Sequence, residues 1–215
     1  MGLLNFLLQL FNSNPLVAVL FVGGLMYSII LHEMAHAYAA DKMGDKTARW
    51  LGRLSLDPRR HFDPIGALAM LLIGFGWAKP VPINPYNFRD YRKGQAIVAA
   101  AGPLTNFAIA FVLTALPVLF SINPGSALGI AIRPLIYVNL VLAAFNLIPI
   151  PPLDGSRVVK ALAPRDVGAF MDRLEASFGI GLILLLSFTG VLGRVAFTLA
   201  GFLQGIIRGA LAPFV

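Results

Sequence analysis

The chain alternates between long apolar stretches and short polar or proline-rich segments. The apolar stretches cover residues 15–43, 65–77, 94–120, 134–148, 178–192 and 195–210. A helix that crosses the hydrocarbon core of a bilayer needs about 20 consecutive, mostly apolar residues. Two stretches exceed that length, and little of the chain lies outside the apolar stretches. The pattern therefore predicts an all-α polytopic membrane protein with about 4–6 membrane segments.

The first long stretch has boundary signals at both ends. Asn14 is a predicted N-cap and Pro15 suits the first helical position, while Gly44 should end the helix. Residues 2–11 are apolar but too short to span, so we expect an interfacial helix there. These residues lack the basic start and small-residue cleavage site of a signal peptide, so no cleavable signal is expected.

The second apolar stretch, residues 65–77, is too short for a single crossing. Basic segments flank it, and one crossing would place them on opposite sides of the membrane. We therefore expect a re-entrant or half-helical element after the first spanning helix, followed by extended chain at residues 78–86. Residues 49–56 partly alternate in hydropathy, which is compatible with a short strand.

The later stretches contain polar and helix-breaking residues. Asn106 needs a polar partner inside the helix predicted at 94–120, which makes it a weaker candidate for a functional site. In the helix predicted at 134–148, Asn139 and Asn146 share one face. Three prolines, at 149, 151 and 152, then break an apolar backbone, which is tolerated at membrane depth only inside protein or beside a polar cavity.

Composition supports the membrane prediction. The chain has 215 residues, of which 58% are hydrophobic and 13% charged. Its mean hydropathy is +0.78. Soluble domains are about half apolar and a quarter charged. One domain, residues 1–215, is expected, and the absence of cysteine means that a transition-metal site must use His, Asp and Glu.

The charge distribution predicts an orientation and argues against nucleic acid as a partner. The net charge is +7, but most basic residues cluster in short loops predicted at residues 41–63, 79–93 and 157–175, between apolar runs. This is the distribution that the positive-inside rule describes, with these segments in the cytoplasm. We therefore expect a multi-pass protein of the cell membrane whose partner surface is the lipid bilayer.

Only two acidic residues, Glu33 and Asp154, lie outside those segments. An ionisable residue at the end of a membrane segment indicates a functional site. Glu33 belongs to the pattern H-E-x-x-H, in which His32 and His36 project from one helix face and can bind a single zinc ion. Glu33 stands beside them, suited to take a proton from water.

Asp154 stands at the end of another apolar segment, in the run Pro151-Pro152-Leu153-Asp154-Gly155. Two crossings separate the basic segment after His36 from the one after Asp154, so both segments lie on the same side. The topology therefore brings Asp154 to the depth of the two histidines, nearer the cytoplasmic face.

Together, His32-Glu33-Met34-Ala35-His36 and Asn146-Leu147-Ile148-Pro149, with Leu153-Asp154-Gly155, resemble the signatures of the site-2 protease family. These are intramembrane zinc metalloproteases, classified as peptidase family M50. Gly102-Pro103 and Asn106 also look like a family element. The resemblance covers roughly residues 15–160 and is closest to the compact prokaryotic branch that lacks PDZ and CBS domains.

The resemblance implies a role for each matching residue. His32, His36 and Asp154 would bind one Zn²⁺ per chain, and Glu33 would be the general base. Asn146 would help to hold the substrate backbone or the oxyanion. The implied activity is hydrolysis of peptide bonds within or near transmembrane segments of membrane-protein substrates, with the substrate helix unwinding locally.

Several alternatives remain open at this stage. The same residues could serve a metal transporter or metal-binding membrane protein, or the chain could be a catalytically silent scaffold. Residues 78–86 are either a connecting loop or an extended edge that holds substrate by strand addition. Residues 178–212 form one bent span or two helices, and the sequence does not define the oligomeric state.

His61 and the aromatic residues near the segment ends are harder to assign. His61 is surface polar, a partner of a metal ligand or a regulatory ligand. We interpret four aromatic residues as anchors at the membrane interface rather than substrate contacts: Trp50, Trp77, Tyr86 and Tyr91.

Overall fold

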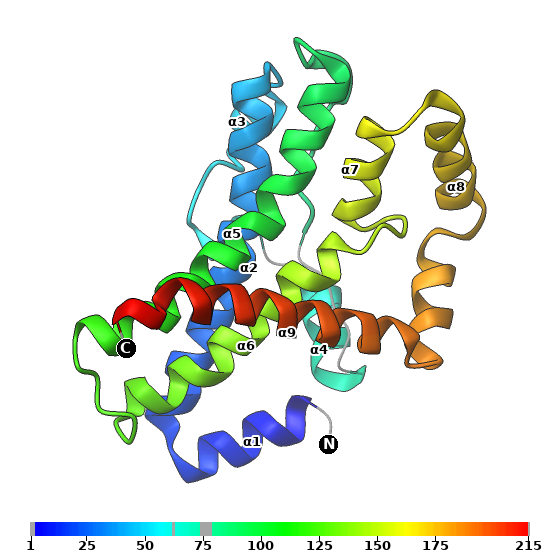
Figure 1. Cartoon of the computed structure of the whole chain (residues 1–215). Coiled ribbons are helices and arrows are strands. Elements are labelled where there is room, and N and C mark those ends of the chain that lie inside the picture. The colour runs from blue at the N-terminus through cyan, green and yellow to red at the C-terminus, as the bar shows by residue number, and fades with distance from the viewer. Residues whose placement is uncertain (1–2, 62, 74–78, 215) are drawn as a thin grey trace.

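The computed structural model describes residues 3–61, 63–73 and 79–214, and these residues are almost entirely helical (Figure 1). The longer helices are α1 (Leu3–Ser13), α2 (Pro15–Met43), α4 (Pro64–Ile73), α5 (Tyr91–Leu119), α6 (Ala127–Leu147), α7 (Asp154–Leu162), α8 (Arg165–Phe188) and α9 (Val191–Leu211). Short helical turns are α3 (Thr47–Trp50), η1 (Pro58–Arg60), η2 (Pro85–Asn87) and η3 (Ala212–Phe214). The all-α prediction is confirmed.

Four helices of the described chain are long and apolar enough to cross a membrane: α2, α5, α6 and α9. This number agrees with the lower end of the predicted range. Helix α5 contacts α2, α6, α7 and α9, and therefore links the two ends of the sequence. Figure 1 shows α9 crossing in front of α6, and a core of Ala110, Leu140, Ala144, Ala200 and Ile207 fills the contact between α5, α6 and α9.

Helix α2 begins and ends where the sequence predicted. The Asn14 side chain accepts a hydrogen bond from the Val17 amide, and Pro15 occupies the first turn. Gly44 ends the helix with φ 118°, a left-handed conformation that glycine adopts without steric cost. The residues between these caps carry the H-E-x-x-H motif as one uninterrupted helix.

Several predictions of secondary structure were wrong. Residues 47–50 form α3 and turns follow, so no strand occupies residues 49–56. Helix α6 begins at Ala127 rather than Pro134, because the Ser126 hydroxyl caps it by accepting from the Gly129 amide. The basic residues 157–175 form most of α7 and the first half of α8 rather than a loop.

Two further predictions concern the less regular segments. Helix α4 is too short to span, as expected for a half-helix, but residues 74–78, including Trp77, lie outside the described residues. Residues 79–84, the extended segment, form neither helix nor strand, as their prolines predicted. The prediction of extended chain at residues 85–86 was wrong, because these residues begin the helical turn η2. The last apolar stretches form two helices, α8 and α9, and α8 bends at Gly179, where φ is 27°.

Candidate active site

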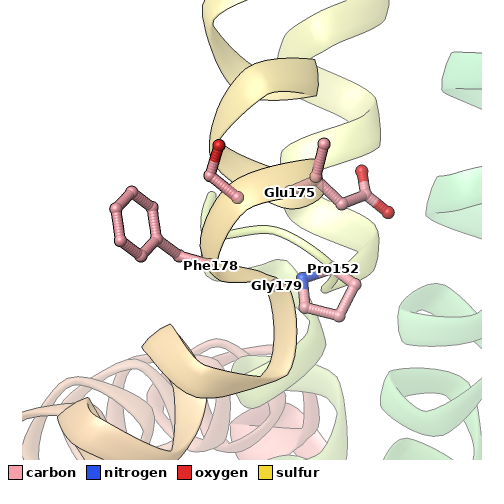
Figure 2. A pocket seen from close by; sticks show the side chains of 6 residues that line it. Pro152, Glu175, Phe178 and Gly179 are labelled. Atoms are coloured by element: carbon pink, nitrogen blue, oxygen red, sulfur yellow. The ribbon is translucent and has the colours of Figure 1, made fainter.

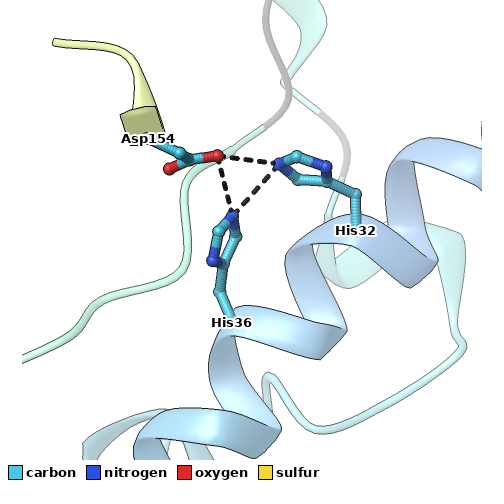
Figure 3. Close-up of side chains that lie close together, drawn as sticks. All are labelled: His32, His36 and Asp154. Carbon is cyan, nitrogen blue, oxygen red and sulfur yellow. Dashed lines mark hydrogen bonds and ion pairs between the residues drawn. The ribbon is translucent and has the colours of Figure 1, made fainter. Parts of the chain in front are cut away.

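Helix α2 presents His32 and His36 on one face, one turn apart (Figure 3). Their Nε2 atoms lie 3.1 Å from each other, and the two imidazole planes meet at 79°. Both side chains are nearly buried, with 9% and 7% of their surface exposed. The helical spacing therefore brings two nitrogen atoms to one point in the protein interior.

Asp154 reaches the same point from the beginning of α7. Its Oδ2 atom lies 3.4 Å from His32 Nε2 and 3.2 Å from His36 Nε2 (Figure 3). The helix α6 ends at Leu147, and the proline-rich turn that follows delivers Asp154 to the two histidines. The three ligand atoms lie within 4.8 Å of one another.

The chemistry of these three groups fits a metal ion. His36 Nδ1 lies 2.7 Å from the Val98 carbonyl oxygen, which can only accept a hydrogen bond, so Nδ1 carries the proton. The Nε2 atom of neutral His36 is consequently an acceptor, and it faces a carboxylate oxygen, another acceptor. A cation between these atoms turns their mutual repulsion into coordination.

Gly102 of α5 leaves room for such an ion. A Cβ atom built at this position would overlap the Nε2 atoms of both histidines. Gly102, which the sequence indicated as part of a possible family element, therefore borders the candidate metal site. Two imidazoles, one carboxylate and an open side are the protein contribution found in catalytic zinc sites.

Glu33 follows His32 on α2 and points toward the extended segment. Its Oε2 atom accepts a hydrogen bond from the Val81 amide at 3.1 Å. Glu33 and His36 also line one cavity of about 380 Å³. The carboxylate is therefore available beside the metal ligands rather than among them.

Residues from five regions of the chain form the walls of this cavity: α2, the segment 80–88, α5, α7 and α8. They include Pro80 and Val81 of the extended segment, Tyr91 and Gln95 of α5, and Arg157 and Lys160 of α7. Tyr86 and Tyr91 line the cavity and are also 87% and 43% exposed, so their role as interface anchors stays a prediction. Nothing in the sequence indicates this position, because it depends on how the chain from η2 to the start of α5 packs against the end of α2.

A second cavity, of about 520 Å³, lies at the bend of α8 (Figure 2). Pro152, Glu175, Phe178 and Gly179 line it. Glu175 belongs to both cavities, so the two adjoin at this residue.

The remaining candidate residues lie in different environments. Asn146 Nδ2 donates to the Leu142 carbonyl of its own helix at 3.0 Å, and its role with substrate stays a prediction. His61 is buried, with Nε2 at 2.7 Å from the Ser55 carbonyl oxygen, which favours a structural role. Asn106, the weaker candidate, lies directly against His32, with 2.5 Å between Asn106 Oδ1 and His32 Nδ1.

Comparison with known proteins gives a consistent result. Residues 127–188 match the model described as Peptidase family M50. The chain is 41% identical over 172 residues to "Putative zinc metalloprotease YwhC" of Bacillus subtilis, an alignment that covers 77% of this chain and 78% of YwhC. It is 32% identical over 190 residues to "Zinc metalloprotease MJ0392" of Methanocaldococcus jannaschii, covering 86% of this chain and 46% of that longer protein. No solved structure matches the chain.

Proposed function

The chain belongs to peptidase family M50, the site-2 protease family, and from this premise we propose that it cleaves peptide bonds within or near transmembrane helices. It is a zinc metalloprotease with several membrane segments. One observation carries the proposal: His32, His36 and Asp154 converge from the ends of membrane helices, with Glu33 in the same cavity.

In this proposal each residue has a separate task. His32, His36 and Asp154 hold one zinc ion, which when bound lowers the pKa of water and polarises a carbonyl group. Glu33 accepts the proton of the attacking water and later returns it to the leaving amine. Asn146 helps to hold the substrate backbone or the oxyanion once its amide leaves the Leu142 carbonyl.

The extended segment supports the interpretation as a substrate-binding edge. Residues 79–84 run beside Glu33, and the cavity lies along Pro80, Val81 and Ile83. A peptide that is helical keeps its backbone amides and carbonyls bonded to each other, so it must unwind before water can attack. An extended neighbour offers replacement partners for the unwound stretch.

We place the site nearer the cytoplasmic face of the cell membrane. His32 and His36 lie beyond the middle of the 29-residue helix α2, and the end of this helix leads into the basic segment 41–63. Helix α6 runs toward the same end, and its C-terminus leads to Asp154 and the basic helix α7. The positive-inside rule assigns this end to the cytoplasm.

The experiment compares wild type with Glu33→Gln, both purified in detergent and reconstituted into vesicles with a transmembrane-helix substrate. We expect both proteins to hold about one zinc per chain and the variant to lose about 10²–10⁴-fold in cleavage rate. Asp166→Asn, an exposed carboxylate of α8, is the matched control and should cleave normally. Zinc-loaded wild type that cleaves soluble peptides but spares membrane helices would contradict the proposed substrate class.

A further inference from the structure

A hydrogen-bonded chain of buried polar side chains lies next to the metal site, between three membrane helices. Its members are Ser28 and His32 on α2, Asn106 on α5 and Asn139 on α6. Asn106 and Asn139 have no exposed surface, and Ser28 is 3% exposed. Polar groups inside a membrane protein are costly unless they are paired, so each contact in this chain needs an explanation.

The direction of every hydrogen bond in the chain follows from two backbone carbonyls. Ser28 Oγ lies 2.8 Å from the Gly24 carbonyl oxygen, which can only accept, so the single hydroxyl proton of Ser28 points there. Ser28 Oγ must then accept from Asn139 at 2.9 Å, which identifies the nearer Asn139 atom as Nδ2. The same Nδ2 donates to the Leu135 carbonyl at 2.9 Å.

The orientation of Asn106 follows from that of Asn139. With both N–H groups of Asn139 used, its Oδ1 atom accepts from Asn106 Nδ2 at 2.9 Å. Asn106 Oδ1 therefore faces His32 Nδ1, and an amide oxygen cannot donate. The proton must lie on His32 Nδ1, which leaves the lone pair of Nε2 directed at His36 and Asp154.

We propose that Asn106 is a positioning residue for the zinc site, which acts through His32, and that Asn139 and Ser28 fix its orientation. The inference rests on the proposed function, because it assigns this task to the same metal site. A partner that accepts the second N–H of a ligating histidine holds the ring and raises its basicity toward the metal. His36 receives the same support from the Val98 backbone, so only His32 depends on a side chain.

If Asn106 served helix packing alone, its substitutions would affect stability and not zinc affinity. Asn106 supports the metal ligand with Oδ1 and links helices with Nδ2, which donates to Asn139 Oδ1 and, at 3.5 Å, to the Ser28 carbonyl oxygen. Aspartate at this position keeps an acceptor for His32 but loses the donor to Asn139. Leucine has a similar volume and loses both. The two substitutions therefore separate metal affinity from helix association.

The test measures the zinc affinity of the full-length protein by competition with a chelator, together with the midpoint temperature of unfolding of the zinc-free protein. Asn106→Leu should bind zinc about 10–100-fold more weakly than wild type. Asn106→Asp should unfold at lower temperature yet bind zinc close to the wild-type affinity. Thr105→Val, whose hydroxyl contacts only its own helix through the Ala101 carbonyl, is the control and should match wild type.

Ser28→Ala is a milder change, at the end of the hydrogen-bonded chain that is farthest from His32. Its zinc affinity should lie between those of wild type and Asn106→Leu. Wild-type zinc affinity in Asn106→Leu, or equal losses in the Leu and Asp variants, would overturn the inference while leaving the proposed protease intact. Absence of zinc from wild type itself would overturn both.

Discussion

Gly102 shows how one residue without a side chain can determine whether a metal site exists. We expect Gly102→Ala to fold but to bind little or no zinc, because the added methyl group would overlap the Nε2 atoms of His32 and His36. Zinc content after gel filtration, together with helix content from circular dichroism, checks this.

The matched control is Gly201→Ala on α9, where an added Cβ would have no atom within 4 Å and alanine should slightly favour the helix. Full zinc occupancy in Gly102→Ala would place the ion elsewhere than between these histidines.

Asp154 is the candidate ligand whose position depends most on tertiary structure. Asp154→Ala leaves two imidazoles from one helix and removes the only ligand on α7, so we expect the variant to lose zinc during dialysis that leaves wild type loaded. His36→Ala should behave in the same way. If Asp154→Ala kept its zinc while His36→Ala lost it, the third ligand would have to be sought elsewhere, and His61 would be examined first.

The candidate site could be predicted from the sequence only as far as its residues form patterns. His32, Glu33 and His36 follow from helical spacing, and Asp154 from its isolation and from the topology. The contact between Asn106 and His32 joins residues 74 positions apart, and nothing local indicates it. The Val98 carbonyl that supports His36 belongs to the backbone, so no residue type could have revealed it.

For the helices, capping residues predicted the boundaries better than prolines did. The bounds of helix α2 were predicted correctly because Asn14 and Gly44 act through local backbone geometry, which their residue types alone indicate. The start of helix α6 was predicted wrongly because Pro134 lies inside the helix, a position that membrane helices tolerate. The cap at Ser126 was the correct signal.

Asp45 connects the end of α2 to the extended segment and is fully buried. One of its oxygens accepts from Asn84 N at 2.8 Å, and the other accepts from Asn87 Nδ2 and from Thr47. Burial raises the pKa of Asp45, but these hydrogen bonds outweigh it and leave the pKa below its ordinary value. The charged form therefore holds residues 79–84 against the active-site helix.

We expect Asp45→Asn to lower the free energy of unfolding at pH 7 by about 1–3 kcal/mol, since an amide group would face buried donors. A carboxyl group with a lowered pKa stabilises the fold above its unfolded pKa, near 3.9 for Asp, and loses this contribution as the pH falls through its folded pKa.

Thermal unfolding of both proteins across a pH series measures the effect. The difference between wild type and variant should be constant above about pH 5 and shrink below pH 4. Asp57→Asn, whose carboxylate pairs with the exposed Arg59, should change stability little. A difference that grew on acidification would contradict the assigned charge of Asp45.

For the molecule as a whole, helix α5 explains how two distant motifs form one site. It lies between α2 and α6, contacts α7, and supplies Gly102, Asn106 and Val98 to the two histidines. A range of about four to six membrane segments was predictable from hydropathy, and so was the meeting of His36 and Asp154 at one end of the helices. The cavity was not, because it depends on how η2, α7 and α8 fold over that end of the bundle.

The same topology predicts which segments face which side of the membrane. The turn between α5 and α6 carries no charge, whereas α7 and the first half of α8 are rich in basic residues. Because the chain contains no cysteine, Gly125→Cys and Arg173→Cys each introduce a single reactive thiol at an exposed position. In intact spheroplasts, a membrane-impermeant maleimide should label Gly125→Cys, and it should label Arg173→Cys only after permeabilisation. The reverse pattern would place the candidate active site at the outer face, and equal labelling of both would contradict the odd number of crossings between the two positions.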